Sequence, residues 1–184
     1  ALPHLLALAA FRDVALLGPV RDGRPAFVLA RDRLGPAPQV ERSAALAELA
    51  RRYLAGHAPA TPEDMARWAG LPLREARAGF AAAPSPPRSV PQIPPARLLP
   101  SFDPYLLGWR DRTFAVPAEH ARRVHPGGGV LRPAATVAGL VTGTWRLRAG
   151  RVETEPFARL AAEDAAALAA EAEDVARFTG RLAP

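Results

Sequence analysis

Two periods of apolar residues organise the first part of the chain. In residues 1–11, leucines and alanines recur at helical spacing, and the short apolar runs 14–17 and 26–30 that follow are typical of strands. Glycine-bearing turn signals separate the two runs. Helix, strand, turn and strand is the order of the second half of a winged helix, and it places Arg21 and Arg24 at the tip of the wing.

Three further helices are predicted after a Gly-Pro linker. Apolar positions between 45 and 54 form one stripe on a helix. Thr61-Pro62 has the hydroxyl and the proline that favour the start of the next helix, and Gly70 is suited to its end. A third helix is predicted over 73–80, with Arg74 among the polar residues opposite its apolar side.

The spacing of small residues across these helices has two interpretations. Ala66, Gly70 and Ala76 fit a helix-turn-helix, in which a small residue permits close approach, glycine takes the left-handed turn and an apolar residue docks the second helix. In a helix-turn-helix the exposed Arg74 and Arg77 would be placed to contact DNA. An ordinary three-helix packing unit has the same spacing, so both interpretations stay open.

The remainder of the chain predicts strands and one long helix. The prolines between 84 and 100 exclude helix and predict a stiff, extended linker. Beyond it, apolar and polar residues over 130–137 and 144–155, with glycine-bearing turns between them, predict an antiparallel meander. The alanine-rich segment 163–178, acidic at its start, predicts a final helix.

These elements predict an α+β fold, with tandem winged-helix (helix-turn-helix) units followed by an antiparallel β-rich C-terminal domain with a terminal helix. The predicted domains are the end of a winged-helix unit, with its recognition helix and wing, at 1–34, a winged-helix-like helical unit with the Pro-rich linker at 35–95, and the β-rich domain at 96–184. The chain starts without Met inside a predicted helix, so we expect a fragment.

The chain carries a net positive charge that comes from arginine alone. The formal net charge is +6, and all 24 basic residues are arginine, whose planar fork of donors suits phosphate. The charge favours a polyanionic partner, namely duplex DNA, although a solvated basic surface is the alternative. The absence of cysteine is compatible with a reducing compartment, and no apolar run is long enough for a membrane span. We therefore expect a cytoplasmic, nucleoid-associated monomer without membrane contact.

Cofactor chemistry finds no support in the sequence. The histidines at 4, 57, 120 and 125 lack metal-ligand spacing, so no metal site is expected. Gly127–Gly129 precedes a strand, whereas glycines that cradle a nucleotide open a helix. None of the serines has the flanking glycines of a hydrolase elbow. We expect no cofactor.

Two carboxylates in an aromatic segment are candidates for chemistry on a sugar or a base. Asp103 and Asp111 have the residue type that stabilises an oxocarbenium-like centre or activates water. The alternative is structural, with Asp103 capping a turn before Pro104 and Asp111 pairing with a neighbouring arginine. A stand-alone hydrolase would require both carboxylates in one cleft.

A second candidate region combines glycines with cations. Arg122, Arg123, His125 and Arg132 surround Gly127–Gly129, where glycine permits close backbone approach and arginine supplies phosphate contacts. A flexible, solvated hairpin is the alternative. The full set of predicted DNA contacts is Arg21, Arg24, Arg74, Arg77, Arg122, Arg123, His125 and Arg132.

Four segments together resemble a known family. They are FDPYLLGWRDR at 102–112, HPGGGV at 125–130, TGTW at 142–145 and APATPEDMARWAGL at 58–71. Taken in chain order, they resemble the AlkZ-like winged-helix DNA glycosylases across essentially the whole chain. The first two segments are specific, whereas the helix-turn-helix alone is not.

The resemblance implies tandem winged helices and a β-rich domain that grip duplex DNA, and excision of alkylated purines, crosslinked ones included, without metal or organic cofactor. The family's catalytic motif is Gln-x-Gln or Gln-x-Asp in the first winged helix. Here Gln39 is followed by Val-Glu and Gln92 by Ile-Pro, so no catalytic residue is assigned in this chain. Residues 1–34 resemble the end of the second unit, which places the first unit outside the chain.

Two functional hypotheses remain open. The first is the DNA-binding C-terminal portion of a DNA repair glycosylase, and the second is a non-catalytic winged-helix DNA-binding or regulatory protein that kept the scaffold without the chemistry. The presence or absence of the glutamine motif in the preceding sequence distinguishes them.

Overall fold

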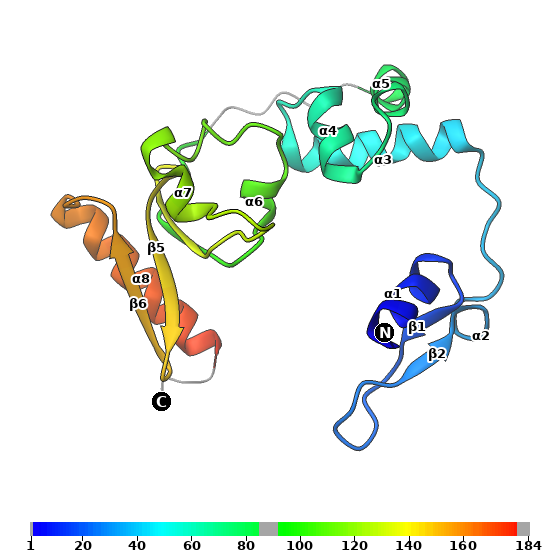
Figure 1. Ribbon diagram of the computed structural model, residues 1–184, viewed down its shortest axis with the longest axis horizontal. Coiled ribbons are helices and arrows are strands. Elements are labelled where there is room, and N and C mark those ends of the chain that lie inside the picture. The colour runs from blue at the N-terminus through cyan, green and yellow to red at the C-terminus, as the bar shows by residue number, and fades with distance from the viewer. Residues whose placement is uncertain (1, 85–91, 180–184) are drawn as a thin grey trace. The chain divides into compact units, whose positions relative to one another are not determined.

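The computed structural model combines helices with antiparallel strands, which confirms the α+β class (Figure 1). It describes residues 2–84 and 92–179. The chain divides into two compact units, Ala1–Ala44 and Ala45–Pro184. Residues 85–91 of the predicted Pro-rich linker lie outside the described residues.

The first unit has the predicted order of elements. Helix α1 (Leu2–Phe11) is followed by strands β1 (Ala15–Leu17) and β2 (Phe27–Leu29), which pair in antiparallel fashion. A short helix, α2 (Ala30–Leu34), follows at once. It was not predicted, because Ala30 continues the apolar run of β2 and the run alone does not show where the strand ends.

The connection between β1 and β2 contains a tight turn at its tip. The Arg21 amide donates to the Arg24 carbonyl at 3.0 Å, and the Arg24 amide donates back at 2.9 Å. Asp22 and Gly23 between them have φ angles of 51° and 72°. Two consecutive positive φ angles are those of a type I′ hairpin turn, for which Asp-Gly is a favoured pair. The predicted placement of both arginines at the tip is confirmed.

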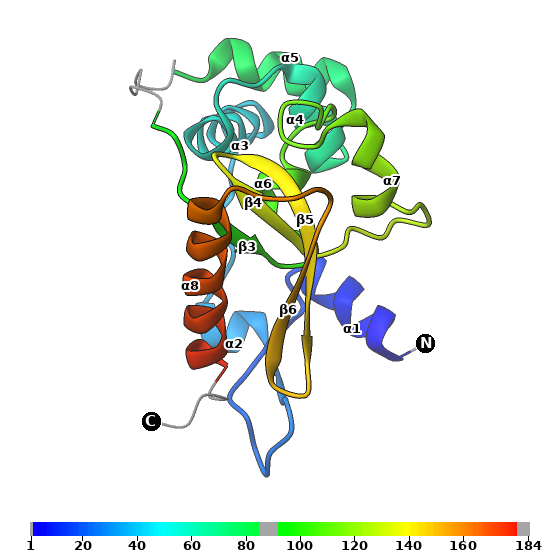
Figure 2. The ribbon, with the colours of Figure 1, turned by 90° about the vertical axis from the view of Figure 1, so that its left-hand side faces the viewer.

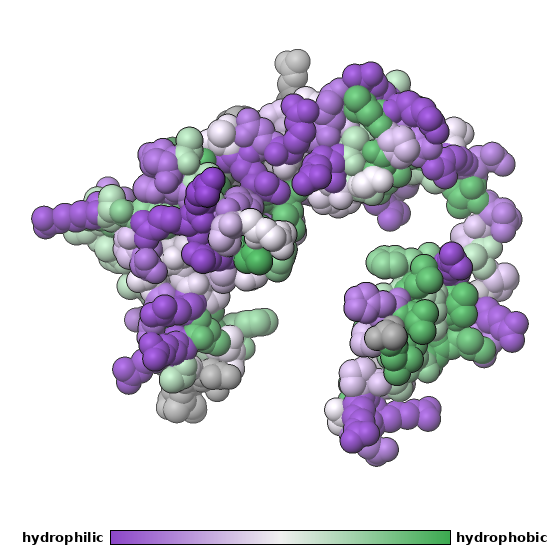
Figure 3. Space-filling model, in the orientation of Figure 1, coloured by the Kyte–Doolittle hydropathy of each residue, from purple (hydrophilic) through white to green (hydrophobic). Residues whose placement is uncertain are grey.

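The first unit leaves most of its apolar side chains exposed. Ala30 is its only residue in the buried class among those described, and Phe11 is 87% exposed. Hydrophobic residues gather over the surface of this unit in Figure 3. They line an open groove of about 760 Å³ between α1 and β1. The described residues of this unit therefore enclose no core of their own.

The second unit begins with three packed helices, α3 (Arg42–His57), α4 (Pro62–Ala69) and α5 (Leu73–Ala82). Helix α3 extends beyond the predicted apolar stripe in both directions and runs through Gly56. The interior of the three helices consists of Ala50, Tyr53, Met65 and Ala76.

Local hydrogen bonds account for the ends of α4. The Thr61 hydroxyl accepts from the Asp64 amide at 3.2 Å, and the Asp64 carboxylate accepts from the Thr61 amide at 2.9 Å, which forms a capping box. Gly70 ends the helix with φ 65° and ψ 28°, the left-handed conformation that glycine adopts without strain. The predicted start and end of this helix are confirmed, whereas its role in a winged helix stays a prediction.

A four-stranded antiparallel sheet forms the rest of this unit, in the order β3-β4-β5-β6. Its strands are β3 (Arg97–Leu99), β4 (Ala134–Val137), β5 (Leu140–Arg148) and β6 (Arg151–Pro156). Helix α8 (Ala162–Phe178) lies along the sheet in Figure 2.

The starts of β3 and β4 differ from the sequence predictions. Strand β3 lies inside the stretch predicted as linker up to residue 100, because an edge strand needs only a few residues without proline. The predicted strand over 130–137 begins only at Ala134, since Val130 closes the turn that starts at Gly127 and residues 131–133 are irregular. The two hairpins and the final helix are confirmed, with register pairs Val137↔Leu140 and Arg148↔Arg151.

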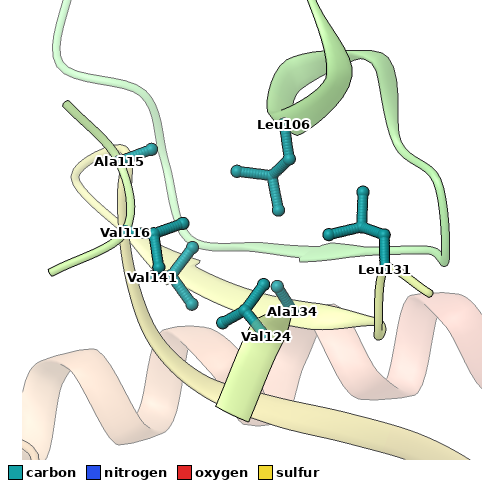
Figure 4. Packing of buried hydrophobic residues seen from close by; sticks show 7 residues of the cluster. All are labelled: Leu106, Ala115, Val116, Val124, Leu131, Ala134 and Val141. Atoms are coloured by element: carbon teal, nitrogen blue, oxygen red, sulfur yellow. The ribbon is translucent and has the colours of Figure 1, made fainter. Parts of the chain in front are cut away.

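Both faces of the sheet are covered. Leu98 and Ala135 pack with Leu168 of α8 on one face. The other face packs against α6 (Pro104–Leu107) and α7 (Ala121–Val124), where the buried cluster of Figure 4 forms. Burial on both faces explains why β4 is a continuous run of small and apolar residues instead of an alternating pattern. The cluster consists of Leu106, Ala115, Val116, Val124, Leu131, Ala134 and Val141.

Helices and sheet meet at the segment that follows α6. The Tyr53 hydroxyl donates to the Gly108 carbonyl at 2.6 Å, and the Trp109 indole donates to the Pro59 carbonyl at 3.0 Å. His57 stacks on Tyr53 with ring centroids 4.8 Å apart. A Cβ added at Gly108 would lie 2.0 Å from Cδ2 of His57, so this close approach requires glycine.

The first prediction concerns this contact. Gly108→Ala should lower the free energy of unfolding by about 1–3 kcal/mol, because the new methyl group overpacks against the His57 ring. In a His57→Ala background the same change should cost clearly less, since the ring is gone. Urea unfolding of the unaltered chain, the two single variants and the double variant measures the cost of Gly108→Ala with and without the His57 ring.

Gly56→Ala is the matched control. No atom lies within 4 Å of a Cβ added there, so alanine should be neutral or stabilise the helix by about 0.5–1 kcal/mol. Equal costs of Gly108→Ala in both backgrounds would contradict the steric explanation.

Candidate nucleic-acid interface

The glycine-rich segment after α7 is a turn. The Val130 amide donates to the Gly127 carbonyl at 3.1 Å, and the Arg132 amide donates to the Val124 carbonyl at 3.0 Å. All three residues of Gly127–Gly129 have positive φ angles, of 107°, 62° and 76°. The glycines are therefore required by the backbone of the turn itself, whether or not a ligand approaches.

The predicted cations beside this turn have different surroundings. Arg123 donates to a Glu155 oxygen at 2.9 Å, and its guanidinium carbon lies 4.2 Å from the centre of the Phe157 ring. Arg132 donates to the Arg123 carbonyl at 3.3 Å. Arg122 is exposed, and no acid in the part of the chain that the structure describes forms an ion pair with it. The structure thus holds Arg123 in place and leaves Arg122 to solvent.

The arginines of α5 differ in the same way. Arg77 donates to Glu63 of α4 at 2.9 Å, and this hydrogen bond holds the pKa of the Glu63 carboxyl below its ordinary value. Arg74 is exposed and has no acid partner among residues 2–84 and 92–179. The charge of Arg77 is therefore compensated inside the protein, and that of Arg74 is not.

The eight predicted DNA contacts form three groups. The structure brings together Arg122, Arg123, His125 and Arg132 around the glycine turn. Arg74 and Arg77 lie on α5 of the same unit. The remaining two, Arg21 and Arg24, belong to the other unit, where both are exposed.

A small pocket near the turn contains an arginine that the sequence analysis did not select. The pocket has a volume of about 310 Å³, and Asp111, Arg112 and His125 are its charged or titratable lining residues. The Arg112 Nε donates to the Leu106 carbonyl. Burial, followed by the nearby Arg67, lowers the pKa of the Arg112 guanidinium. Arg112 thus lies in a partly buried and positively charged environment.

His125 contributes an unsatisfied atom to the same region. Its Nε2 is shielded from solvent and has no hydrogen-bond partner. Burial is the largest influence on the ring, followed by the charge of Arg112, and together they lower the pKa of His125 although a hydrogen bond with the Val130 backbone opposes them. The ring is therefore neutral at pH 7.

The two candidate carboxylates have structural partners. An oxygen of Asp103 accepts from the Tyr105 amide at 2.8 Å and so caps α6, as the structural alternative expected. Asp111 forms no ion pair with an arginine in the described residues, contrary to the structural alternative. It accepts from the Thr113 amide at 2.9 Å, and this bond holds its pKa below the ordinary value. Asp103 does not line the pocket that Asp111 lines. The geometry gives a stand-alone hydrolase no support.

In the part of the chain that the structure describes, no group of three or more His, Asp or Glu residues is arranged to hold a metal ion. Within the same residues, none of the helices combines the length and the apolar character that crossing a bilayer demands.

Comparison with known proteins identifies relatives. The family model described as "DNA glycosylase AlkZ-like" matches residues 2–87 and 80–178. Among solved structures, the DNA glycosylase AlkZ of Streptomyces sahachiroi is similar with a TM-score of 0.77 and 26% sequence identity, over 96% of this chain and 54% of that one. The chain thus spans about half the length of this relative. No curated protein matches the chain.

The second prediction concerns His125 and pH. Because its pKa is lower in the folded chain than the ordinary 6.5, the unfolded chain binds more protons just below that pH. Stability should therefore be full above about pH 6.5 and fall as the pH drops toward the lowered pKa, by at most about 1.4 kcal/mol per pH unit. His125→Gln should remove this component. Urea unfolding at about pH 7.5 and about pH 5.5 measures it, with His4→Gln as the control. The same pH dependence in His125→Gln would contradict the assignment.

Proposed function

The chain belongs to the AlkZ-like DNA glycosylase family, and we propose that it is the DNA-binding C-terminal portion of a winged-helix DNA repair glycosylase that acts on alkylated or crosslinked purines. The observation that carries the proposal is the structural similarity to a DNA glycosylase over 96% of the chain. The catalytic glutamine motif lies outside this chain in this proposal, because neither Gln39 nor Gln92 begins a Gln-x-Gln or Gln-x-Asp sequence.

The proposal assigns a role to each segment. Residues 1–34 supply a recognition helix and a wing whose tip holds two arginines. Residues 35–95 supply a second helical unit in which α4, the Gly70 turn and α5 act as a helix-turn-helix. Residues 96–184 supply the β-rich domain and the glycine turn. The order of elements and the left-handed Gly70 support this assignment.

The proposed DNA contacts differ in whether the arginine already forms an ion pair with an acid. Five of them have no acid partner in the described ranges and can meet phosphate without losing an ion pair. Arg77 and Arg123 must exchange an exposed carboxylate for a phosphate, a small loss because exposed ion pairs contribute little. Phosphate contacts position a protein without reading bases, so binding should depend weakly on sequence. The five are Arg21, Arg24, Arg74, Arg122 and Arg132.

The third prediction tests the glycine turn as a DNA contact. Replacing Arg122 and Arg123 together by alanine should lower the magnitude of the log-log salt slope of duplex binding by about 2, because each phosphate contact contributes roughly 0.9. Duplex affinity measured over a series of salt concentrations gives the slope. Arg159→Ala, an exposed change elsewhere in the same unit, should leave it unchanged. An unaltered slope in the double variant would move the contact to Arg74 and Arg77.

The fourth prediction concerns catalysis. The purified chain should release no free base from duplex DNA that carries N7-alkylguanine, since it lacks the glutamine motif. Chromatography of the released bases is the measurement, with a preparation free of host glycosylases. Base release by the chain alone would refute the proposed location of the catalytic residues and direct attention to Asp103 and Asp111.

A further inference from the structure

The pocket beside the glycine turn holds a cation without a counter-ion. Nε of Arg112 is occupied by the Leu106 carbonyl, which leaves the two terminal amino groups as donors. No acid in the described residues forms an ion pair with Arg112. The charge that acts on it is another cation, Arg67 of α4. Arg67 adds to the positive potential at Arg112, and a bound anion would lower that potential.

The Nε2 atom of the neighbouring His125 has no hydrogen-bond partner. The Val130 backbone forms a hydrogen bond with the ring, while Nε2 is shielded from water and unbonded. A buried polar atom without a partner is unfavourable, and native structures contain few of them. A proton on Nε2 would turn this atom into a second cationic donor beside Arg112.

The lining of the pocket favours phosphate over a nucleobase. Its apolar wall consists of Val116, Ala118 and Ala121, and no Phe, Tyr or Trp ring lines it as a broad platform for a base. Asp111 is the one acid in the lining, and its carboxylate already accepts hydrogen bonds from Thr113. A compact anion that accepts from a guanidinium fits these walls best.

We propose that this pocket binds one phosphodiester group of DNA, that Arg112 donates to its oxygens, and that His125 takes up a proton from solvent when the phosphate binds. The inference rests on the proposed DNA-binding function and adds Arg112 to the residues that carry it, with Arg67 acting on Arg112 through its charge. No covalent bond forms or breaks, and the only transfer is one proton from water to Nε2.

Proton uptake links DNA affinity to pH. In the free protein, burial and Arg112 keep the ring of His125 neutral. A phosphate within contact distance adds the opposite charge, which raises a pKa by about 1–3 units. Duplex affinity therefore increases as the pH falls from the pKa of His125 in the complex to its pKa in the free protein. The increase is about tenfold for each unit that separates these two pKa values. The charged groups that face the ring are Arg112 and the rim residue Asp111, with Arg67 beside Arg112.

The first experiment follows the His125 ring itself. NMR titration of the full chain with labelled histidine gives the pKa of His125 with a short duplex, with dimethyl phosphate, and with chloride at equal ionic strength. We expect an upward shift of the His125 pKa of at least about one unit with both phosphodiesters. An unchanged His125 titration overturns the proposal. A shift with dimethyl phosphate alone assigns the pocket to small free phosphodiesters and overturns its role in DNA binding.

The second experiment uses variants with opposite expected signs. Arg112→Gln should weaken duplex binding by roughly tenfold or more, as the loss of a hydrogen bond to a charged group does. Arg67→Ala should also weaken it, whereas Asp111→Asn should strengthen it, because the amide oxygen still accepts from Thr113 and the negative charge is gone. Arg159→Ala is the control. Arg112 also bonds Leu106, so the other two variants keep the test independent of folding.

The two proposals fail in different ways. If the unaltered chain does not bind duplex DNA, the proposed function is wrong, whatever the pocket does. If the unaltered chain binds, but affinity is the same at each pH and in all three charge variants, the function stands and the assignment of the pocket is wrong.

Discussion

Within residues 45–184, the architecture depends on the contact between α3 and the segment after α6. Tyr53 donates from a buried position to the Gly108 carbonyl, and burial raises the pKa of its hydroxyl, which therefore remains a donor at every physiological pH. His57 occupies the space that a side chain at residue 108 would need. Because Arg110 also donates its amide to Asp64, the same segment fixes the start of α4 and so the position of Arg67 relative to Arg112.

The sheet gives the glycine turn a rigid base. Val124 before the turn and Leu131 after it are both buried in the cluster of Figure 4, against Val141 of the central strand β5. The residues between them have no core contact of that kind and bend through positive φ angles. The turn and His125 are therefore held at the surface by the packing of their two neighbours, which suits a contact that must meet a rigid polyanion.

Net charge alone does not show which arginines are available to a partner. Arg77 and Arg123 are compensated by glutamates from other elements, although the sequence places them in the same clusters as Arg74 and Arg122. Arg112 is the reverse case, since it is adjacent to an acid in sequence but forms no ion pair with any acid that the structure describes. The partner of an arginine is thus decided by which elements pack together.

Most helices and turns could be predicted from the sequence, because they depend on interactions between neighbouring residues. The capping of α4 at Thr61, the left-handed Gly70 and the tight turn at Asp22-Gly23 each depend on a few neighbouring residues, so the pattern determined them. The pocket of Arg112 and His125 did not follow from the sequence, because it joins residues whose burial and charge depend on distant neighbours. The sequence by itself determined the α+β elements, the family resemblance and the excess of positive charge. Only the tertiary structure decided which of those charges lacks a counter-ion, since that depends on contacts between segments far apart in the chain.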